Sequence, residues 1–271
     1  MILGAYALPH PPLAVPVVGR GQEAEIKDTL LAFSQVSKEI TNLNPDTLIF
    51  ITPHGTVYSD YFHISPGGKA VGDFLRFGVS GFRIESEYDE ALVQEITRYA
   101  TNSNLPAGTE GERDGSLDHG VTVPLWFIRQ ATGDNKDGDN KIVRISQSGM
   151  SPMEHYRLGQ VIAEASGKTN RRVVLIASGD LSHKLTSSGP YGYAPEGPEF
   201  DKTVVNALKT GDFSQLFNIT DKKRQAAAEC GYNSFMVLAG CLDGKEFDAK
   251  LLSYEGPFGV GYAVASFTLK E

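Results

Sequence analysis

The sequence predicts an α/β fold in a single domain spanning residues 1–271, with a mostly parallel or mixed central sheet flanked by helices on both faces. Three observations support this prediction. Short apolar runs alternate with amphipathic segments of helical period along most of the chain. The last two apolar runs are adjacent, which adds antiparallel strands to the sheet. Hydrophobic residues make up 41% of the chain, and no segment reads as a linker, so one core is expected.

The chain opens with a predicted βαβ unit. A strand over Ile2–Leu8 precedes a helix over Gln22–Asn42, and a second strand over Thr47–Ile51 follows. Less regular strands are expected over Phe62–Ser65 and Phe74–Val79. In chain order, the later predictions are a helix over Tyr88–Tyr99, a short helix after Asp118-His119-Gly120 to Gln130, a strand over Lys141–Ser146, a helix over Ser151–Gly167, a strand over Arg172–Ala177, helices over Glu199–Thr210 and Tyr232–Leu242, and a hairpin of Asp248–Tyr254 with Val260–Thr268. The polar stretch 133–140 is predicted to be one surface loop.

Composition excludes several function classes. The 25 Lys and Arg residues against 33 Asp and Glu give a net charge of −8, so nucleic acid is not an expected partner. No apolar run approaches the roughly 20 residues that span a bilayer, so no membrane helix is expected. The apolar start lacks basic residues and runs into Pro9-His10-Pro11-Pro12, which indicates a strand rather than a signal peptide, and a cytoplasmic protein. Cys230 and Cys241 are too few for a disulfide framework and are expected to be reduced.

Three of the six histidines lie just past the ends of predicted strands. They are His10, His54 and His183. Loops from different strands converge at the carboxyl ends of an open α/β sheet, so these imidazoles can meet in one crevice. Neutral imidazole is the commonest protein metal ligand, and the prolines beside His10 and His54 restrict the backbone there. The three histidines together therefore predict a metal site, although any one of them alone would better fit a hydrogen bond within a loop.

A carboxylate would complete the ligand set that is typical of non-haem ferrous iron. Glu229 is the leading candidate, because it lies among small residues at the start of an apolar helix, where an unpaired carboxylate is costly to bury. Its neighbour Cys230 is the alternative third ligand, since thiolates also bind transition metals. Glu229 also fits an exposed carboxylate at a helix start, which the dipole of the following helix stabilises.

Two further clusters couple a histidine to an aspartate: Asp118 with His119, and Asp180 with His183. A carboxylate that orients an imidazole suits general acid–base chemistry. For Asp180 we favour a turn-forming role, because it follows a glycine. Ser178 follows a strand but lacks the Gly-x-Ser-x-Gly pattern, so a serine hydrolase is not indicated.

Five stretches spread over nearly the whole chain carry a family resemblance. Together they resemble the class III extradiol ring-cleavage dioxygenase superfamily, catalytic-subunit type, which includes Memo-like relatives. The stretches are Ala7–Pro12, Ile51–Gly55, Leu117–Leu125, Ala177–His183 and Tyr254–Tyr262.

The resemblance implies roles for individual residues. His10 and His54 match the metal-binding histidines, and Glu229 matches the carboxylate ligand. His183 matches the active-site acid–base, and His119 a histidine on the substrate side or one that supports the ligands. Memo-like relatives carry Cys-Gly at a place comparable to Cys230-Gly231, so the resemblance also admits Cys230 as the third ligand.

The expected function is that of a non-haem Fe(II)-dependent extradiol dioxygenase, which cleaves a small catecholic aromatic beside its diol with O2. Two alternatives remain open. One is a Zn(II)-dependent hydrolase, in which the same ligands activate a water molecule. The other is a Memo-like metal-binding or peptide-binding protein without ring-cleavage activity. By resemblance, the partners are the aromatic diol and O2, with a homodimer or a small second subunit possible.

Overall fold

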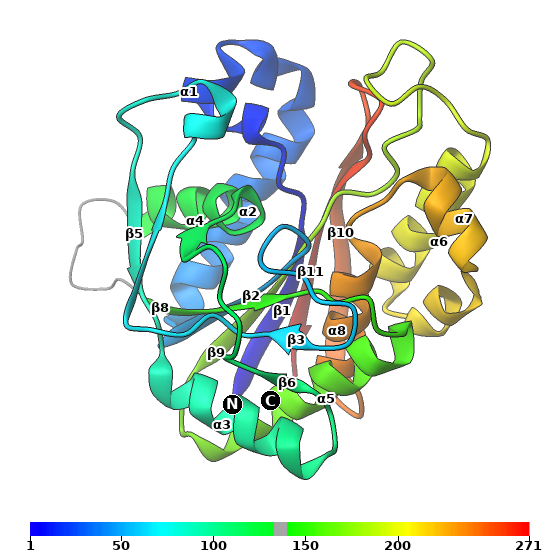
Figure 1. The fold of residues 1–271 in the computed structure, drawn as a ribbon. Helices are drawn as coiled ribbons and strands as arrows, with labels where there is room; N and C mark the ends of the chain where they lie inside the picture. The colour runs from blue at the N-terminus through cyan, green and yellow to red at the C-terminus, as the bar shows by residue number, and fades with distance from the viewer. Residues whose placement is uncertain (133–139, 271) are drawn as a thin grey trace.

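A six-stranded mixed sheet forms the centre of the protein (Figure 1), in a computed structural model that describes residues 1–132 and 140–270. Its strands are β1 (Ile2–Leu8), β2 (Thr47–Thr52), β8 (Lys141–Ser146), β9 (Val173–Ser178), β10 (Phe247–Glu255) and β11 (Tyr262–Leu269). Their order across the sheet is β10-β11-β1-β9-β2-β8. β1, β9, β2 and β8 run parallel, whereas β11 pairs antiparallel with both β1 and β10. The α/β prediction with a mixed sheet is therefore confirmed.

Helices cover both faces of this sheet because alternate residues of its buried strands point to opposite sides. In β2, Leu48 and Phe50 join a core cluster with residues of α2 (Lys27–Leu43) and α4 (His119–Thr132). Ile49 and Ile51 join the cluster of the opposite face. The helices that contribute to that second cluster are α3 (Glu90–Asn102), α5 (Pro152–Lys168), α6 (Glu196–Thr210), α7 (Asp221–Ala227) and α8 (Tyr232–Cys241).

Short elements connect these layers. Small sheets pair β3 with β6, and β4 with β5 and β7. Their bounds are β3 (Phe62–His63), β4 (Lys69–Gly72), β5 (Ile84–Glu87), β6 (Ala107–Gly108) and β7 (Ser116–Leu117); the short helices are α1 (Pro16–Gly19) and the 3₁₀ turns Pro12–Ala14, Gln22–Ile26, Leu75–Phe77 and Phe213–Asn218. No helix within the two described ranges is long and apolar enough to cross a membrane.

The structure corrects the predicted elements in two places. The opening strands β1 and β2 are parallel, as predicted, but β9 is inserted between them. The predicted strand over Phe74–Val79 is wrong, since this segment forms the 3₁₀ turn Leu75–Phe77. Asp73 Oδ1 accepts the amide hydrogen of Leu75 at 3.0 Å, and Gly78 ends the turn with φ 75°. The loop predicted over 133–140 falls outside the described residues except for Asn140.

The sheet order places three strand ends side by side. β1 pairs with β9 up to Leu8 and Ser178, and β9 pairs with β2 up to Ala177 and Ile51. The segments that follow these three strands therefore leave the sheet at one edge, where ligands bind in open α/β sheets.

Candidate metal centre

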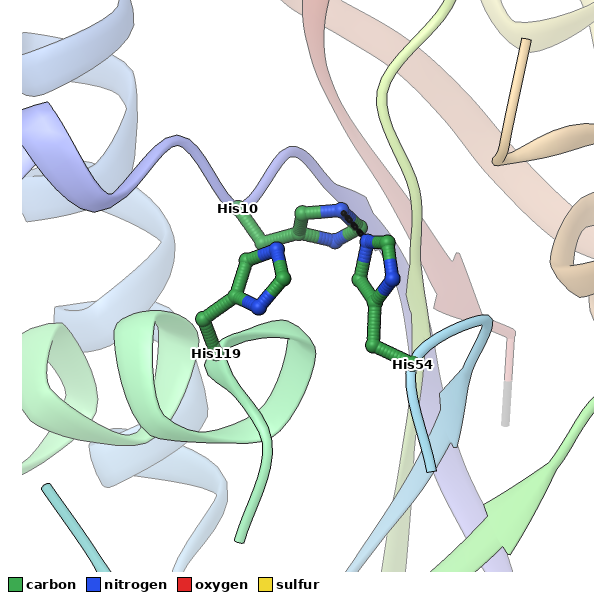
Figure 2. A group of neighbouring side chains, drawn as sticks. All are labelled: His10, His54 and His119. Carbon is green, nitrogen blue, oxygen red and sulfur yellow. Dashed lines mark hydrogen bonds between the residues drawn. The ribbon is translucent and has the colours of Figure 1, made fainter. Parts of the chain in front are cut away.

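Three histidine side chains point toward one another at this edge (Figure 2). His10 follows β1, His54 follows β2, and His119 is the first residue of α4. The Nε2 atoms of His10 and His54 are 3.1 Å apart, and one ring nitrogen from each of the three residues lies within 4.8 Å of the others. Two nitrogens held about 2.0–2.1 Å from one tetrahedral ion lie roughly 3.3 Å apart. The His10–His54 pair therefore fits a shared metal ion.

Hydrogen bonds fix the ring of His10. Its Nδ1 lies 2.8 Å from Ser178 Oγ, and that hydroxyl donates its only proton to the carbonyl oxygen of Gly120. Ser178 must therefore accept a proton from His10, so the proton of the neutral ring is on Nδ1. This leaves the lone pair of Nε2 directed at His54, as a metal ligand requires.

Asp118 anchors the turn that carries His54 rather than pairing with its neighbour His119. Its Oδ1 accepts the Thr52 hydroxyl at 2.6 Å, and Thr52 Oγ1 accepts the backbone N–H of His54 at 3.2 Å. Asp118 Oδ2 lies 3.8 Å from Arg144 Nη1, and the Arg144 side chain is buried. The turn after β2 is thus held by side chains from two other segments.

Burial keeps the clustered imidazoles neutral. It lowers the pKa of His10 well below the usual value, and the charges of His54 and His119 lower it further. Burial lowers the pKa of His54, although the carboxylate of Asp118 opposes this shift. Burial and then His54 lower the pKa of His119 to about 3. A neutral ring at pH 7 has a free lone pair, so it can bind a metal ion without first losing a proton.

His183 lies beside this cluster rather than in its group of close nitrogens. Its backbone N–H donates to the carbonyl of Ala227 at 3.0 Å, and its ring meets Tyr191 edge-on with centroids 5.1 Å apart. Burial lowers its pKa, and the nearby charge of His54 lowers it further. The structure therefore brings His10, His54 and His119 together, with His183 at the side.

Asp180 has a larger part than the predicted turn. Its Oδ1 accepts the backbone N–H of His10 at 2.8 Å, and its carbonyl oxygen accepts the N–H of Gly231 at 2.9 Å. Complete burial raises the pKa of this carboxyl to about 7. Asp180 thus ties the segment after β9 to the segments that carry His10 and Cys230.

Cys230 is adjacent to the histidine pair. Its Sγ lies 3.6 Å from His10 Nε2 and accepts the backbone N–H of Asp180 at 3.2 Å. A sulfur held about 2.3 Å from a tetrahedral ion lies roughly 3.6 Å from a nitrogen ligand of that ion. Gly179 permits the close approach of this segment, because a Cβ on Gly179 would lie 2.1 Å from the Cα of Gly231.

Glu229 points elsewhere. Its Oε1 accepts Arg224 Nε at 2.9 Å, and its Oε2 accepts the backbone N–H of Tyr232 at 2.7 Å, so it caps the start of α8. The guanidinium of Arg224 lies 4.0 Å from the centre of the Tyr232 ring. This ring contact helps to hold Arg224 in place beside Glu229. Both carboxylate oxygens are satisfied, and Glu229 is not part of the histidine group. Glu229 therefore lies at the helix start, as the alternative predicted, but it is buried rather than exposed, and its two oxygens are held by Arg224 and Tyr232.

A cavity of about 370 Å³ opens beside His54 and His119. Phe77 forms part of its wall and meets the ring of His119 edge-on at 5.3 Å. Arg76 and Arg113 also line it. No sequence motif marks these three residues: Arg113 lies in a loop, and Arg76 and Phe77 fall in the segment wrongly predicted as a strand.

Comparisons with known proteins identify relatives. The family model "Catalytic LigB subunit of aromatic ring-opening dioxygenase" matches residues 4–265. Protein CA_C1420 of Clostridium acetobutylicum is 40% identical over 96% of this chain, although the chain spans only 56% of that protein's length. The 3,4-dihydroxyphenylacetate 2,3-dioxygenase of Escherichia coli is 23% identical, over 81% of this chain and 82% of the relative.

Two further matches extend this group. A MEMO1 family protein of Sulfurisphaera tokodaii is 24% identical over 72% of this chain and 59% of its own. The crystal structure of an uncharacterized protein of Escherichia coli K12 has the same fold, with a TM-score of 0.64 at 16% identity, covering 97% of this chain and 99% of the other. With a family model that matches almost end to end, the chain belongs to the family of catalytic LigB subunits of aromatic ring-opening dioxygenases.

Proposed function

We propose that this protein is a non-haem Fe(II) dioxygenase that opens the ring of a small catecholic aromatic with O2. One observation carries the proposal: the paired Nε2 atoms of His10 and His54 lie 3.1 Å apart, and His54 lines the cavity. Membership of the family supports it, as does the similarity to a 3,4-dihydroxyphenylacetate 2,3-dioxygenase.

His10 and His54 would hold the ion. The third ligand comes from Cys230 or His119 in this proposal, because the carboxylate of Glu229 is engaged by Arg224 and Tyr232. Bound Fe(II) would supply a Lewis-acidic centre with open positions for the diol and O2. Zn(II) fits the same donors, so metal identity is part of the test.

His183 would move protons for the substrate. Its partly buried ring is neutral at pH 7, because burial lowers its pKa, so one ring nitrogen can accept a proton from a diol hydroxyl. The cavity would orient the diol, with Phe77 and His119 offering ring surfaces at one wall. Enclosure by these side chains limits the access of water to the reacting ring.

A second candidate function is a Memo-like metal-binding protein without ring cleavage. The observation that favours it is the Cys230 sulfur 3.6 Å from His10 Nε2, where the dioxygenase resemblance calls for a carboxylate. Both candidates need the same histidine pair, so they differ in reaction and not in site.

Anaerobic loading with Fe(II), followed by exposure to O2 and a panel of catechols, tests the proposal. We expect a yellow ring-opened product and matching O2 consumption with at least one catechol. The His54→Ala protein should form none, and the His155→Asn protein, altered at a buried histidine on α5, should match wild type. If iron binds with full occupancy and no catechol is opened, the Memo-like candidate replaces the dioxygenase.

A further inference from the structure

Asp201 is a buried carboxylate that the proposed chemistry does not use. It lies on α6 and is 1% exposed. Its Oδ1 accepts the backbone N–H of Ser182 at 2.8 Å, and its Oδ2 accepts the Tyr254 hydroxyl at 2.6 Å. Burial raises the pKa of this carboxyl to about 7, and the hydrogen bonds from Tyr254 and Ser182 oppose the shift. Because a buried carboxylate is costly without hydrogen bonds, these two donors fix the direction of the side chain.

The N–H that Asp201 accepts belongs to the residue directly before His183. The peptide group between Ser182 and His183 is also bound at both of its ends. The carbonyl of Ser182 accepts the N–H of Gly261 at 2.8 Å, and the N–H of His183 donates to the carbonyl of Ala227 at 3.0 Å. Together with the bond to Asp201, these contacts fix the backbone that carries the His183 ring.

Glycines allow α6 to lie directly against this segment. A Cβ on Gly261 would lie 2.2 Å from Asp201 Oδ2, and a Cβ on Gly197 would lie 2.6 Å from Ser182 Oγ. Gly197 precedes Asp201 by four residues on α6, so both face the segment from the same side of the helix. A contact this close leaves no slack, so a change at Asp201 should displace the backbone at Ser182.

The surroundings of the His183 ring make such a displacement matter. Burial lowers the pKa of His183, whereas backbone contacts with Ala228 and Leu181 oppose this shift. The polar environment of the ring is thus set largely by backbone groups next to those that Asp201 helps to hold.

We propose that Asp201 is a positioning residue: oriented by Tyr254, it accepts the Ser182 N–H and so holds the His183 ring where it can exchange protons with the substrate. The proton-transfer role of His183 rests on the proposed function, whereas the position of its ring does not.

Turnover by Fe(II)-loaded variants tests this proposal, with the catechol that the panel identifies. In the Asp201→Ala protein, kcat should fall about 10- to 100-fold, because a displacement of about 1 Å can cost about 10²-fold in rate. Iron content and KM should stay within about twofold of wild type, since neither ligands nor substrate contacts change. The Asp201→Asn protein should recover to within about threefold of wild type, because its amide can accept the Ser182 N–H and donate to the Tyr254 oxygen.

The ring ¹⁵N NMR signals of His183 give a readout that needs no turnover. They would be recorded on iron-free protein with added Zn(II), which is diamagnetic, and assigned by their absence from the His183→Gln protein. Asp201→Ala should shift these signals, and Asp201→Asn should restore them. Tyr254→Phe removes only the hydroxyl that orients Asp201, so it serves if Asp201→Ala fails to fold. It should shift the signals in the same direction and lower kcat about 3- to 10-fold, as expected for one lost hydrogen bond.

Asp89→Ala is the matched control. Asp89 is also 1% exposed, and it accepts the backbone N–H of Leu92 and the hydroxyl of Thr47. Thr47 is the first residue of β2, whereas His54 follows the other end of that strand, so Asp89 is remote from the histidines. This variant should lower stability but leave kcat and the His183 signals unchanged.

Three results would overturn the proposal. They are a loss of kcat in Asp89→Ala that equals that in Asp201→Ala, an Asp201→Asn protein no better than Asp201→Ala, and wild-type His183 signals in both Asp201→Ala and Tyr254→Phe. If the wild-type protein opens no catechol, the proposed function fails, and the NMR signals still decide whether Asp201 positions His183.

Discussion

The floor of the candidate metal site and the rim of the cavity beside it are built differently. The floor, which we define as His10, Ser178, Asp180 and Cys230, joins the segments after β1 and β9 to the start of α8, and each polar side chain has a fixed partner. The rim, defined as Arg76, Phe77 and Arg113, belongs to loops, and Phe77 is 38% exposed whereas His10 is 1% exposed. We infer that the floor is preorganised for metal binding and that the rim sets substrate choice.

Among variants that keep the metal, the largest effect on turnover is expected at His183, which lies beside the floor. The His183→Gln protein should keep its metal while kcat falls about 10²- to 10⁴-fold, because glutamine cannot exchange a proton near neutral pH. Metal analysis and turnover of one preparation check both parts. Loss of the metal would make His183 a ligand, and unchanged turnover would remove it from the mechanism.

Removing the Ser178 hydroxyl tests how the floor orients its ligand. In the Ser178→Ala protein, His10 Nδ1 loses its acceptor, so metal affinity should weaken about 10- to 100-fold. Competition with a chelator of known affinity measures this change. Ser37→Ala is the control, because Ser37 is a buried serine on α2 whose hydroxyl has no hydrogen-bond partner within residues 1–132 and 140–270. If the Ser178→Ala protein bound the metal as tightly as the Ser37→Ala protein, the proposed role of Ser178 would be contradicted.

The pH dependence of the unfolding free energy tests whether His155, a buried histidine outside the floor, is also held in its neutral form. His155 donates from Nδ1 to the Ser151 carbonyl and accepts the Ser148 N–H at Nε2, and burial lowers its pKa to about 4. Because the folded pKa lies below the unfolded value of about 6.5, the stability it contributes is present above pH 6.5 and is lost as pH falls toward 4.

Denaturant titrations at pH 7 and pH 5 measure that contribution. The wild-type protein should lose about 1–2 kcal/mol more unfolding free energy than the His155→Asn protein over this interval. Taking the difference cancels the contributions of the other buried histidines. Identical losses in the two proteins would show that the imidazole is not held neutral.

The smallest effect is expected at the rim. The Phe77→Ala protein should bind a catechol about 2- to 10-fold more weakly, since one aromatic contact contributes about 0.5–1.5 kcal/mol. Its metal content should match wild type, because Phe77 touches His119 but neither His10 nor His54. A loss of metal in this variant would erase the distinction between floor and rim.

Sequence patterns located the strand ends that precede His10 and His54 better than they located the rim, for a physical reason. The strands before His10 and His54 are mostly apolar and almost completely buried, so their ends and the residues after them could be located. The rim depends on a 3₁₀ turn that Asp73 begins and Gly78 ends, and apolar content alone made that segment resemble a strand.

The choice between Glu229 and Cys230 could not be made from sequence, because a single step along a loop reverses the direction of the side chain. Here Ala228 adopts a left-handed conformation with φ 54°, and Arg224 binds the Glu229 carboxylate. Cys230 then lies on the side of His10. Both determinants are contacts or backbone angles that composition and spacing do not reveal.

Metal content tests the central claim, that His10 and His54 hold the metal while Glu229 does not. Wild-type, His10→Ala, His54→Ala and Glu229→Gln proteins would be purified without chelator and analysed for bound transition metal, with circular dichroism as the check of folding. We expect a full complement in wild type and Glu229→Gln, and little metal in the two histidine variants. Full retention in both histidine variants, or an empty but folded Glu229→Gln protein, would contradict the account.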